Sequence, residues 1–298
     1  MLLTPWLRLF TTRLSYVRSA RRHGPSRRRP RLTFERLEDR LLLAAPNPLE
    51  LSTLDGASGY IFEGIDGVDA SGYSVSSAGD VNGDGFNDLL IGAYLADPGG
   101  PGDTREGETY VVFGGAANMA ALDAADSTTD GRINLSNLNG TTGFILAGID
   151  GNDQSGRSVS SAGDINGDGS DDLLIGALNA SPGSPARGVA GETCVVFGGA
   201  ANLAALDAAD STTDGRINLS NLDGTTGFIL EGIDANDRSG RSVSSAGDVN
   251  GDGFNDLLIG AYLADPGGPG DTREGETYVV FGGAANLAAL DAADSTTD

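Results

Sequence analysis

A repeat of 84 residues constrains this chain more than any other feature of its sequence. A nine-residue stretch beginning at Asp80 returns at Asp164 and again at Asp248, so the interval is 84 residues in both cases. The stretch from Asn82 to Asn118 recurs essentially unchanged from Asn250 to Asn286. Because internal repeats of this kind are typical of stacked structural units, the copies must share one structure, and one unit decides the fold.

The repeated stretch carries oxygen-bearing groups at alternate positions. Positions one, three, five and nine are Asp or Asn, position seven offers its backbone carbonyl, and position six is a glycine that permits a sharp reversal of the chain. Such oxygen ligands are typical of Ca²⁺, which also relieves the repulsion between neighbouring carboxylates. The sequence therefore predicts three calcium sites, with these ligands: Asp80, Asn82, Asp84, Phe86 (carbonyl) and Asp88; Asp164, Asn166, Asp168, Ser170 (carbonyl) and Asp172; Asp248, Asn250, Asp252, Phe254 (carbonyl) and Asp256.

Three other structures are open to a stretch of this composition. Asp, Asn and Gly dominate ordinary solvated turns, although three copies with the same ligand positions favour a metal. An EF-hand needs a Glu at position twelve and a following helix, whereas that position holds Ile91, Ile175 or Ile259. A dockerin-like module, which shares the Asp-x-Asn-x-Asp-Gly start, also needs a helix after the loop. We expect a strand there instead.

Four segments of the first unit have the composition of short strands. They are residues 60–63, 74–78, 88–93 and 108–113, and the third is continuously apolar, as expected of a strand buried on both faces. Four short strands per unit make a β-propeller blade. In the connection to the next unit, residues 118–125 are expected to form a helical turn or two with Asn118 as N-cap, and residues 133–135 to extend a sheet edge.

The units resemble FG-GAP repeats, the blades of integrin α-chain propellers and of many bacterial surface proteins. The matching pieces are Phe113-Gly114, Phe197-Gly198 and Phe281-Gly282, with Gly92-Ala93, Gly176-Ala177 and Gly260-Ala261. The family's Pro after Gly-Ala is replaced by Tyr94, Leu178 and Tyr262. The resemblance implies an all-β fold of three four-stranded blades, in repeats of about 55–138, 139–222 and 223–298, and structural rather than catalytic calcium in the aspartate-rich loops.

Three blades are fewer than the four to eight of closed propellers. Stacked units share a core, but an incomplete propeller of three blades leaves two edges open to pairing with other strands. We therefore expect either a fragment of a longer product or association between copies of the chain.

Charge divides the chain into two parts. Residues 1–45 hold eleven Arg against three acids, whereas the remainder holds eight Arg against thirty-nine acids. The acidic body argues against nucleic acid as a partner, since phosphate binding needs cations. We interpret the Arg-rich start, which ends in the apolar segment Leu41–Ala45, as a targeting leader, and it contains no apolar run long enough to span a membrane. The alternative is a basic disordered or nucleic-acid-binding arm. Residues 34–43 resemble the LEPR-XLL segment of large bacterial exported proteins, with Asp39 in place of the motif's Pro.

The body offers few residues for catalysis. The single histidine, His23, lies in the leader, and the single cysteine, Cys194, is interpreted as a small core residue. We therefore expect no enzyme, although some FG-GAP proteins join a propeller to a hydrolase elsewhere in a longer product. The leading hypothesis is a secreted or cell-surface bacterial module for adhesion, which binds an extracellular protein or glycan through loops that differ between units: residues 67–70, 151–154 and 235–238. A purely structural repeat array is the alternative.

Overall fold

The computed structural model describes residues 50–98, 104–183, 186–266 and 273–294. The predicted leader and its LEPR-XLL-like segment lie outside these residues. The described part is built mainly from short antiparallel strands, which confirms the all-β prediction. Three helices, α1 (Ala116–Asp123), α2 (Ala200–Asp207) and α3 (Ala284–Asp294), lie in the connections that follow each group of strands.

A three-stranded antiparallel meander occurs once in each repeat. The meanders are β2 (Ser74–Gly79), β3 (Asp88–Ala93) and β4 (Glu108–Val112); β7 (Ser158–Gly163), β8 (Asp172–Ala177) and β9 (Glu192–Val196); and β12 (Ser242–Gly247), β13 (Asp256–Ala261) and β14 (Glu276–Val280). The middle strands are the apolar Asp-Leu-Leu-Ile-Gly-Ala segments, which are largely buried, and β8, with a blade on each face, is buried throughout. The predicted strand at residues 88–93 is therefore confirmed to the residue.

The fourth strand of a blade comes from the next repeat, which differs from our expectation that the four strands of one unit make one blade. Strand β6 (Gly143–Ala147) pairs antiparallel with β4, and β11 (Gly227–Glu231) pairs in the same way with β9. We call the sheet of β2, β3, β4 and β6 blade 1, that of β7, β8, β9 and β11 blade 2, and that of β12, β13 and β14 blade 3. Residues 113–142, the connection from β4 to β6, lead the chain out of blade 1 and back to the outer edge of the same blade, a path that local composition does not reveal.

Short parallel pairs complete the outer edge. Strand β10 (Arg216–Asn218) adds to β6, and β5 (Arg132–Asn134) pairs with β1 (Ile61–Glu63). Single 3₁₀ turns lie before β1 and beside the helices and short strands: Leu51–Thr53, Ala124–Asp126, Leu135–Asn137, Ala208–Asp210 and Leu219–Asn221. Strand β1, predicted as part of the first blade, thus belongs to a separate two-stranded sheet.

The predicted helical segment forms, but with a different start. Helix α1 begins at Ala116, and Gly115 takes the N-cap position with a φ of +84°, where glycine is favoured. Asn118 lies inside the helix, and its side-chain amide donates to the carbonyls of Phe113 and Thr142 at 2.6 and 3.1 Å. Asn118 therefore joins the end of β4 to the start of β6 rather than capping the helix.

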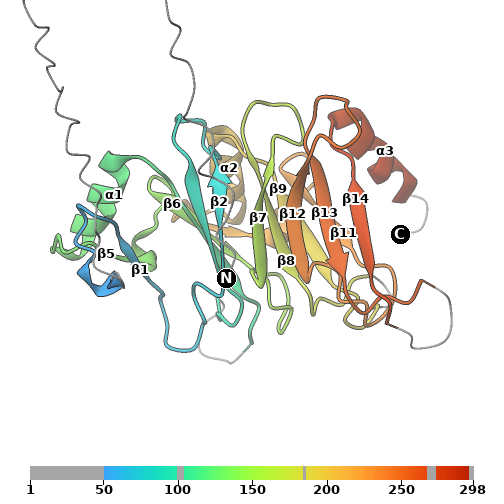
Figure 1. The fold of residues 1–298 in the computed structure, drawn as a ribbon, viewed down its shortest axis with the longest axis horizontal. Coiled ribbons are helices and arrows are strands. Elements are labelled where there is room, and N and C mark those ends of the chain that lie inside the picture. Colours follow the sequence, from blue (N-terminus) through green and yellow to red (C-terminus); the bar gives the residue numbers. More distant parts are fainter. Residues whose placement is uncertain (1–49, 99–103, 184–185, 267–272, 295–298) are drawn as a thin grey trace, which may run out of the picture. The chain divides into compact units, whose positions relative to one another are not determined.

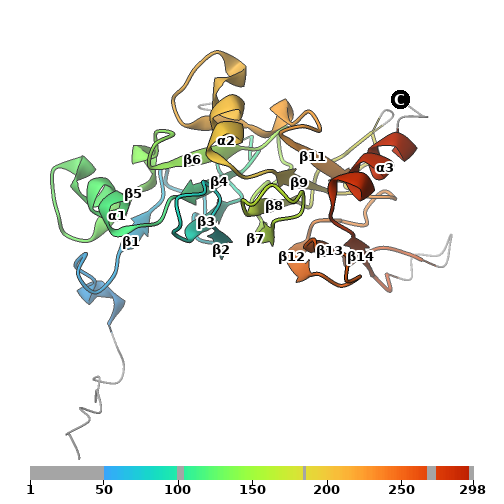
Figure 2. The same cartoon turned by 90° about the horizontal axis from the view of Figure 1, so that it is seen from above.

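The core lies between successive blades. Val81, Val111 and Leu146 of blade 1 pack against Leu173 and Ile175 of blade 2 in one buried cluster, and Ile165 packs against Leu257 in a second. Strand β7 contacts both β2 and β12, so the three blades follow one another in sequence order, as Figures 1 and 2 show. We call the contact between two successive blades a seam. The hydrophobic area buried in these seams is the main source of stability for the series of blades.

Candidate metal-binding loops

Each predicted calcium loop connects the first two strands of a blade. The loops join β2 to β3, β7 to β8 and β12 to β13, and the aspartate at position nine is in each case the first residue of the second strand. A strand rather than a helix follows every loop, which excludes the EF-hand and dockerin arrangements. The three loops have the same position in every blade, so the repeat in sequence is also a repeat in space.

Side-chain oxygens of the first loop accept hydrogen bonds from its own backbone. The Asp80 carboxylate accepts from the N–H groups of Asp84 and Gly85 at 3.0 and 2.9 Å, and Asp84 accepts from Phe86 at 2.9 Å. The Asn82 amide oxygen accepts from Asp84 at 2.9 Å. Gly85 adopts a φ of +89°, which accounts for glycine at position six. The same bonds recur in the second and third loops.

The aspartate at position nine is the buried anchor of each loop. Asp88, Asp172 and Asp256 are fully buried. The Asp88 carboxylate accepts from Val81 N–H at 3.0 Å and from Gly114 N–H at 2.7 Å, so it joins the loop to the end of the third strand. Burial, with a smaller contribution from the Asp84 and Asp80 carboxylates, raises the pKa of Asp88 to about 6. The same causes raise the pKa of Asp172 to about 7.

Each loop brings its predicted ligands together along one bend, but the carboxylates do not converge on one point. Across the described residues, no group of three or more His, Cys, Asp or Glu side chains is arranged to hold a metal ion. The remaining predicted ligands of each loop are an asparagine amide and a backbone carbonyl, at Asn82 and Phe86 in the first copy. The carboxylates are instead turned toward backbone N–H groups.

A residue that sequence reasoning missed joins the loops to each other. The Asp171 carboxylate, at position eight of the second loop, accepts from Asp80 N–H of the first loop at 2.8 Å. The equivalent residues are Asn87 and Asn255. The signal was available, because position eight varies between Asn and Asp, but only the packing of blade 2 on blade 1 gives it a role.

An arginine also crosses the seam between the first two blades. The Arg157 guanidinium lies 4.9 Å from the ring centre of Tyr73 and 4.5 Å from that of Tyr94, both in blade 1. The two rings are themselves 4.5 Å apart. Cation–π contacts of this kind strengthen when they are shielded from water. The substitution of the family's Pro by Tyr94 thus supplies one of the faces on which Arg157 stacks.

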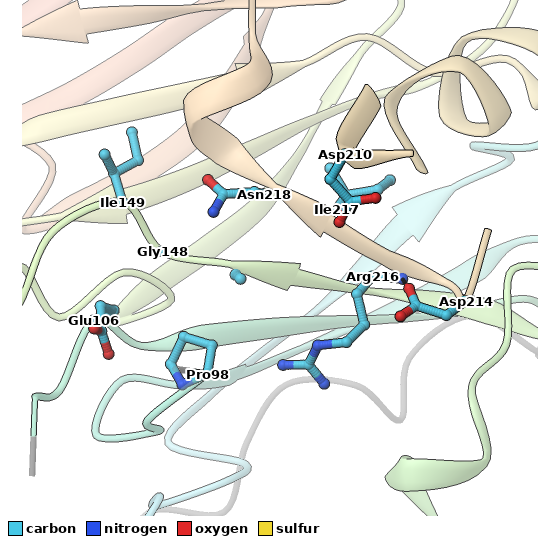
Figure 3. Close-up of a pocket in the computed structure, with 10 residues that line it drawn as sticks. Pro98, Glu106, Gly148, Ile149, Asp210, Asp214, Arg216, Ile217 and Asn218 are labelled. Atoms are coloured by element: carbon cyan, nitrogen blue, oxygen red, sulfur yellow. Dashed lines mark hydrogen bonds between the residues drawn. The ribbon is translucent and has the colours of Figure 1, made fainter. Parts of the chain in front are cut away.

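A small open pocket lies at the outer edge of blade 1. Its volume is about 230 Å³, and its lining includes Glu106, Ile149, Arg216 and Asn218 (Figure 3). Arg216 forms an ion pair with the buried carboxylate of Glu108. This pair connects β10 to β4 across β6, so its first role is to hold the outer strands together.

The loops predicted to contact a partner are partly buried. Asp69, Asp153 and Asp237, at the third position of each, are buried, and the Asp69 and Asp237 carboxylates accept from the N–H of the residue just before the loop, Asp66 and Asp234, at 3.1 Å. The residue that follows, Ala70, Gln154 or Arg238, adopts a left-handed φ of 57–60°. Ala235, Asn236 and Arg238 line a second cavity of about 530 Å³. The fourth residue therefore has the same backbone conformation in each blade but a different side chain, whereas at the second residue Asn152 and Asn236 are left-handed and Val68 is not.

Three segments of the chain match the family model of the FG-GAP repeat. They are residues 71–112, 155–191 and 239–280, and each covers the meander of one blade or most of it. The chain is also similar to integrin alpha-5 of Xenopus laevis, with 29% identity over 221 residues, which cover 72% of this chain. The match covers only 17% of that relative, so the chain spans less than a fifth of its length.

Among helices of the described residues, none has the length and apolar character needed to cross a bilayer. The first and third matches to the family model span a whole meander, and the second spans the first two strands of its meander. The chain therefore contains three FG-GAP repeats, and it folds as a series of β-propeller blades.

Proposed function

We propose that the chain is a calcium-binding β-propeller module that acts outside the cell in adhesion to a protein or glycan. The observation that carries this proposal is the coincidence of three FG-GAP segments with three oxygen-lined loops of identical position. Similarity to an integrin α chain supports the adhesive role. A secreted or cell-surface location is supported by the same similarity, and its bacterial setting by the LEPR-XLL-like segment alone.

The donor chemistry of the loops supports Ca²⁺ as the ion. All predicted ligands are oxygens, which hard divalent cations prefer. Each carboxylate oxygen of Asp80 that accepts one backbone N–H retains a second lone pair for a ligand bond. The raised pKa of Asp88 reflects, in part, the negative potential of Asp80 and Asp84, which a bound cation would relieve. We propose the residues of the three predicted ligand sets as the calcium ligands.

Binding rather than catalysis is the role that the residues support. The body has no histidine, and Cys194 is buried, with burial raising the pKa of its thiol. The carboxylates that recur three times are already accounted for as loop anchors. We place the partner at residues 67–70, 151–154 and 235–238, because these vary in side chain while their fourth residue keeps the same left-handed backbone conformation in each blade.

Calorimetric titration of the metal-free chain with CaCl₂ tests the metal part of the proposal. We expect close to three ions per chain, one for each loop, with a Kd of about 10⁻⁴ to 10⁻³ M as in other extracellular modules. A stoichiometry of zero would overturn it. Binding to arrays of glycans and extracellular proteins, with and without a chelator, tests the adhesive part.

A purely structural array is the second candidate. It is favoured by the near-identity of the first and third repeats, because near-identical repeats offer a binding partner few side chains that differ between blades. Consistent absence of binding in both arrays, with calcium bound, would favour this role.

A further inference from the structure

Blade 1 and blade 3, at the two ends of the series, each expose one half of the contact that joins neighbouring blades inside the chain. Among the described residues, β14 pairs only with β13, whereas β4 and β9 are each paired on both sides. Val279 and Phe281 at this open edge are both 45% exposed, whereas Val111 and Phe113, their equivalents in blade 1, are 0% and 7% exposed. Blade 3 is therefore an inner sheet without an outer strand.

Strand β1 is the complementary half. It pairs with β5 in the register in which β6 pairs with β10, Ile61 opposite Arg132 and Ile145 opposite Arg216. Tyr60 and Phe62 pack against the cluster on blade 1, just as their equivalents Phe144 and Leu146 pack toward blade 2. However, β6 also pairs with β4, whereas β1 has no antiparallel partner in the described structure. Strand β1 is therefore an outer strand without an inner sheet.

The faces at the two ends also match the seams inside the chain. Val75 on blade 1 is 68% exposed, while its equivalent Val159 is covered by blade 1 and 8% exposed. Val249 on blade 3 is 60% exposed, while its equivalents Val81 and Ile165 are 0% exposed because the following blade covers them. Each end thus presents the half of the seam that the other end lacks.

The polar contacts of the seam are repeated atom for atom. Ser74 Oγ donates to the Gly156 carbonyl and Ser158 Oγ to the Gly240 carbonyl, both at 2.7 Å. Gly199 N–H donates to Val81 and Gly283 N–H to Ile165, again at 2.7 Å. At the ends, the equivalent residues are Ser242 and Val249 of blade 3 and Gly72 and Gly115 of blade 1.

We propose that a second copy of this chain docks head-to-tail at these ends, so that blade 3 of one copy packs on blade 1 of the other. Residues 59–63 of the second copy then add to β14 as its outer strand. The register follows from blade 1, where Tyr110 lies opposite Ile145 and Val111 opposite Phe144. It places Tyr278 opposite Ile61 and Val279 opposite Tyr60. With the contact made at both ends, the described residues of two copies supply six blades, a number within the range of closed propellers.

A glycine substitution tests the contact between faces. A Cβ at Gly92 would lie 2.0 Å from the Gly156 carbonyl oxygen, and one at Gly176 2.1 Å from that of Gly240, so both glycines are required by the next blade. The equivalent Gly260 would meet only the Ser242 hydroxyl of its own blade, at 2.5 Å, and that side chain can rotate. Gly260→Ala is therefore expected to leave the single chain folded and to weaken association about tenfold or more.

Sedimentation of the full chain over a range of concentrations, with calcium present, measures this effect. We expect a two-chain species for the unchanged protein and for the control Gly188→Ala, at which a Cβ would meet nothing within 4 Å. Circular dichroism and melting of Gly260→Ala report on its fold. A folded Gly260→Ala that associates as strongly as the control overturns the proposal, as does an unchanged chain that stays single at every concentration.

Disulfide trapping tests the strand register. Ile145 N–H donates to the Gly215 carbonyl on the β10 side and so does not bond to Tyr110, which lies opposite it on β4. Tyr110 and Ile145 are therefore a non-hydrogen-bonded antiparallel pair, the kind in which the side chains lie closest together. The equivalent pair between copies is Tyr278 and Ile61. Tyr278→Cys is a mild change, because blade 2 already has Cys194 at this position. Two chains are mixed under oxidation, one with Tyr278→Cys and one with Ile61→Cys, both in a Cys194→Ala background.

We expect a disulfide-linked pair of different chains. The control replaces Ile61→Cys by Phe62→Cys, since neighbouring side chains point to opposite faces of a strand and the link should then be lost. Equal yields from the two mixtures overturn the register. A chain carrying both Ile61→Cys and Tyr278→Cys that closes on itself as a single chain overturns the two-copy arrangement. Neither test depends on the proposed calcium binding or adhesion.

Discussion

The fully buried aspartate at position nine of each loop shows how a single side chain organises a blade. Asp88 accepts one hydrogen bond from the loop and one from Gly114, beyond the third strand, and its equivalents do the same. It therefore stabilises the hairpin whether or not an ion is bound. The more exposed ligands, Asp80 and Asp84, are the ones whose role depends on the cation.

Asp84→Ala removes a proposed ligand from one loop only. We expect calorimetry to count one fewer calcium ion per chain, and the melting temperature in calcium to fall by a few degrees, because one blade loses its bound ion. Asp130→Ala, an exposed acid in the connection before β5, is the matched control and should leave the count unchanged. An undiminished count for Asp84→Ala would show that the loop does not bind through this residue.

Glu192 provides a pH-dependent contribution away from the loops. Burial, and then the Asp153, Glu231 and Asp150 carboxylates, raise the pKa of Glu192 to about 7. In blades 1 and 3 a tyrosine hydroxyl donates to the equivalent glutamate, whereas blade 2 has Cys194 in its place. Because the folded pKa lies above the unfolded one, ionised Glu192 destabilises the fold, and stability falls as pH rises from about 4.5 to 7.

Glu192→Gln removes this penalty. The variant should be more stable than the unchanged chain at pH 8, on the order of 1 kcal/mol after allowance for solvent screening, and about equal to it at pH 4.5. Urea unfolding at both pH values measures the difference. A gain of the same size at both values would point to packing rather than to charge.

At the scale of elements, the strands follow from local composition while their assignment to blades does not. The apolar segment at 88–93 and the small, β-branched segment at 74–78 both form strands where expected, because period and flanking glycines are local signals. The sheet to which β1 belongs depends on a contact made across the connection from β4 to β6. No feature within residues 60–63 carries that information.

The candidate site, too, could be predicted from the sequence only in part. Spacing of Asp, Asn and Gly located the three loops, and glycine at position six adopts the left-handed φ that its place in the loop predicts. The contacts of Asp171 with Asp80, of Asn118 with Phe113 and Thr142, and of Arg157 with Tyr73 and Tyr94 all depend on how strands or blades pack together. They require the tertiary arrangement and could not be inferred from one repeat.

The seams between blades should be sensitive to a single methyl group. Gly92→Ala would place a Cβ against the Gly156 carbonyl and force blades 1 and 2 apart, at a cost of about 1–3 kcal/mol. The loss is measured by urea unfolding, with Gly67→Ala as the control for a general glycine effect. Equal stability of the two variants would mean that the seam is looser than the structure indicates.

At the scale of the whole molecule, the proposed calcium ions would stabilise all blades together. For a Kd of about 10⁻⁴ M and calcium at about 10⁻² M, each occupied loop adds about 2.7 kcal/mol. Addition of EDTA should therefore lower the melting temperature of the body, and excess CaCl₂ should restore it. Coincident melting curves in calcium and in EDTA would rule out a stabilising ion.

The offset between repeat and blade has a consequence for how such chains grow. Since every outer strand is encoded one repeat later than the sheet it completes, a piece cut at the repeat boundaries, such as residues 139–222, would encode parts of two blades. An in-frame duplication, by contrast, inserts one whole blade into the interior of the series and regenerates the same pair of termini. Chains of different repeat number can thus arise without any new kind of surface having to evolve.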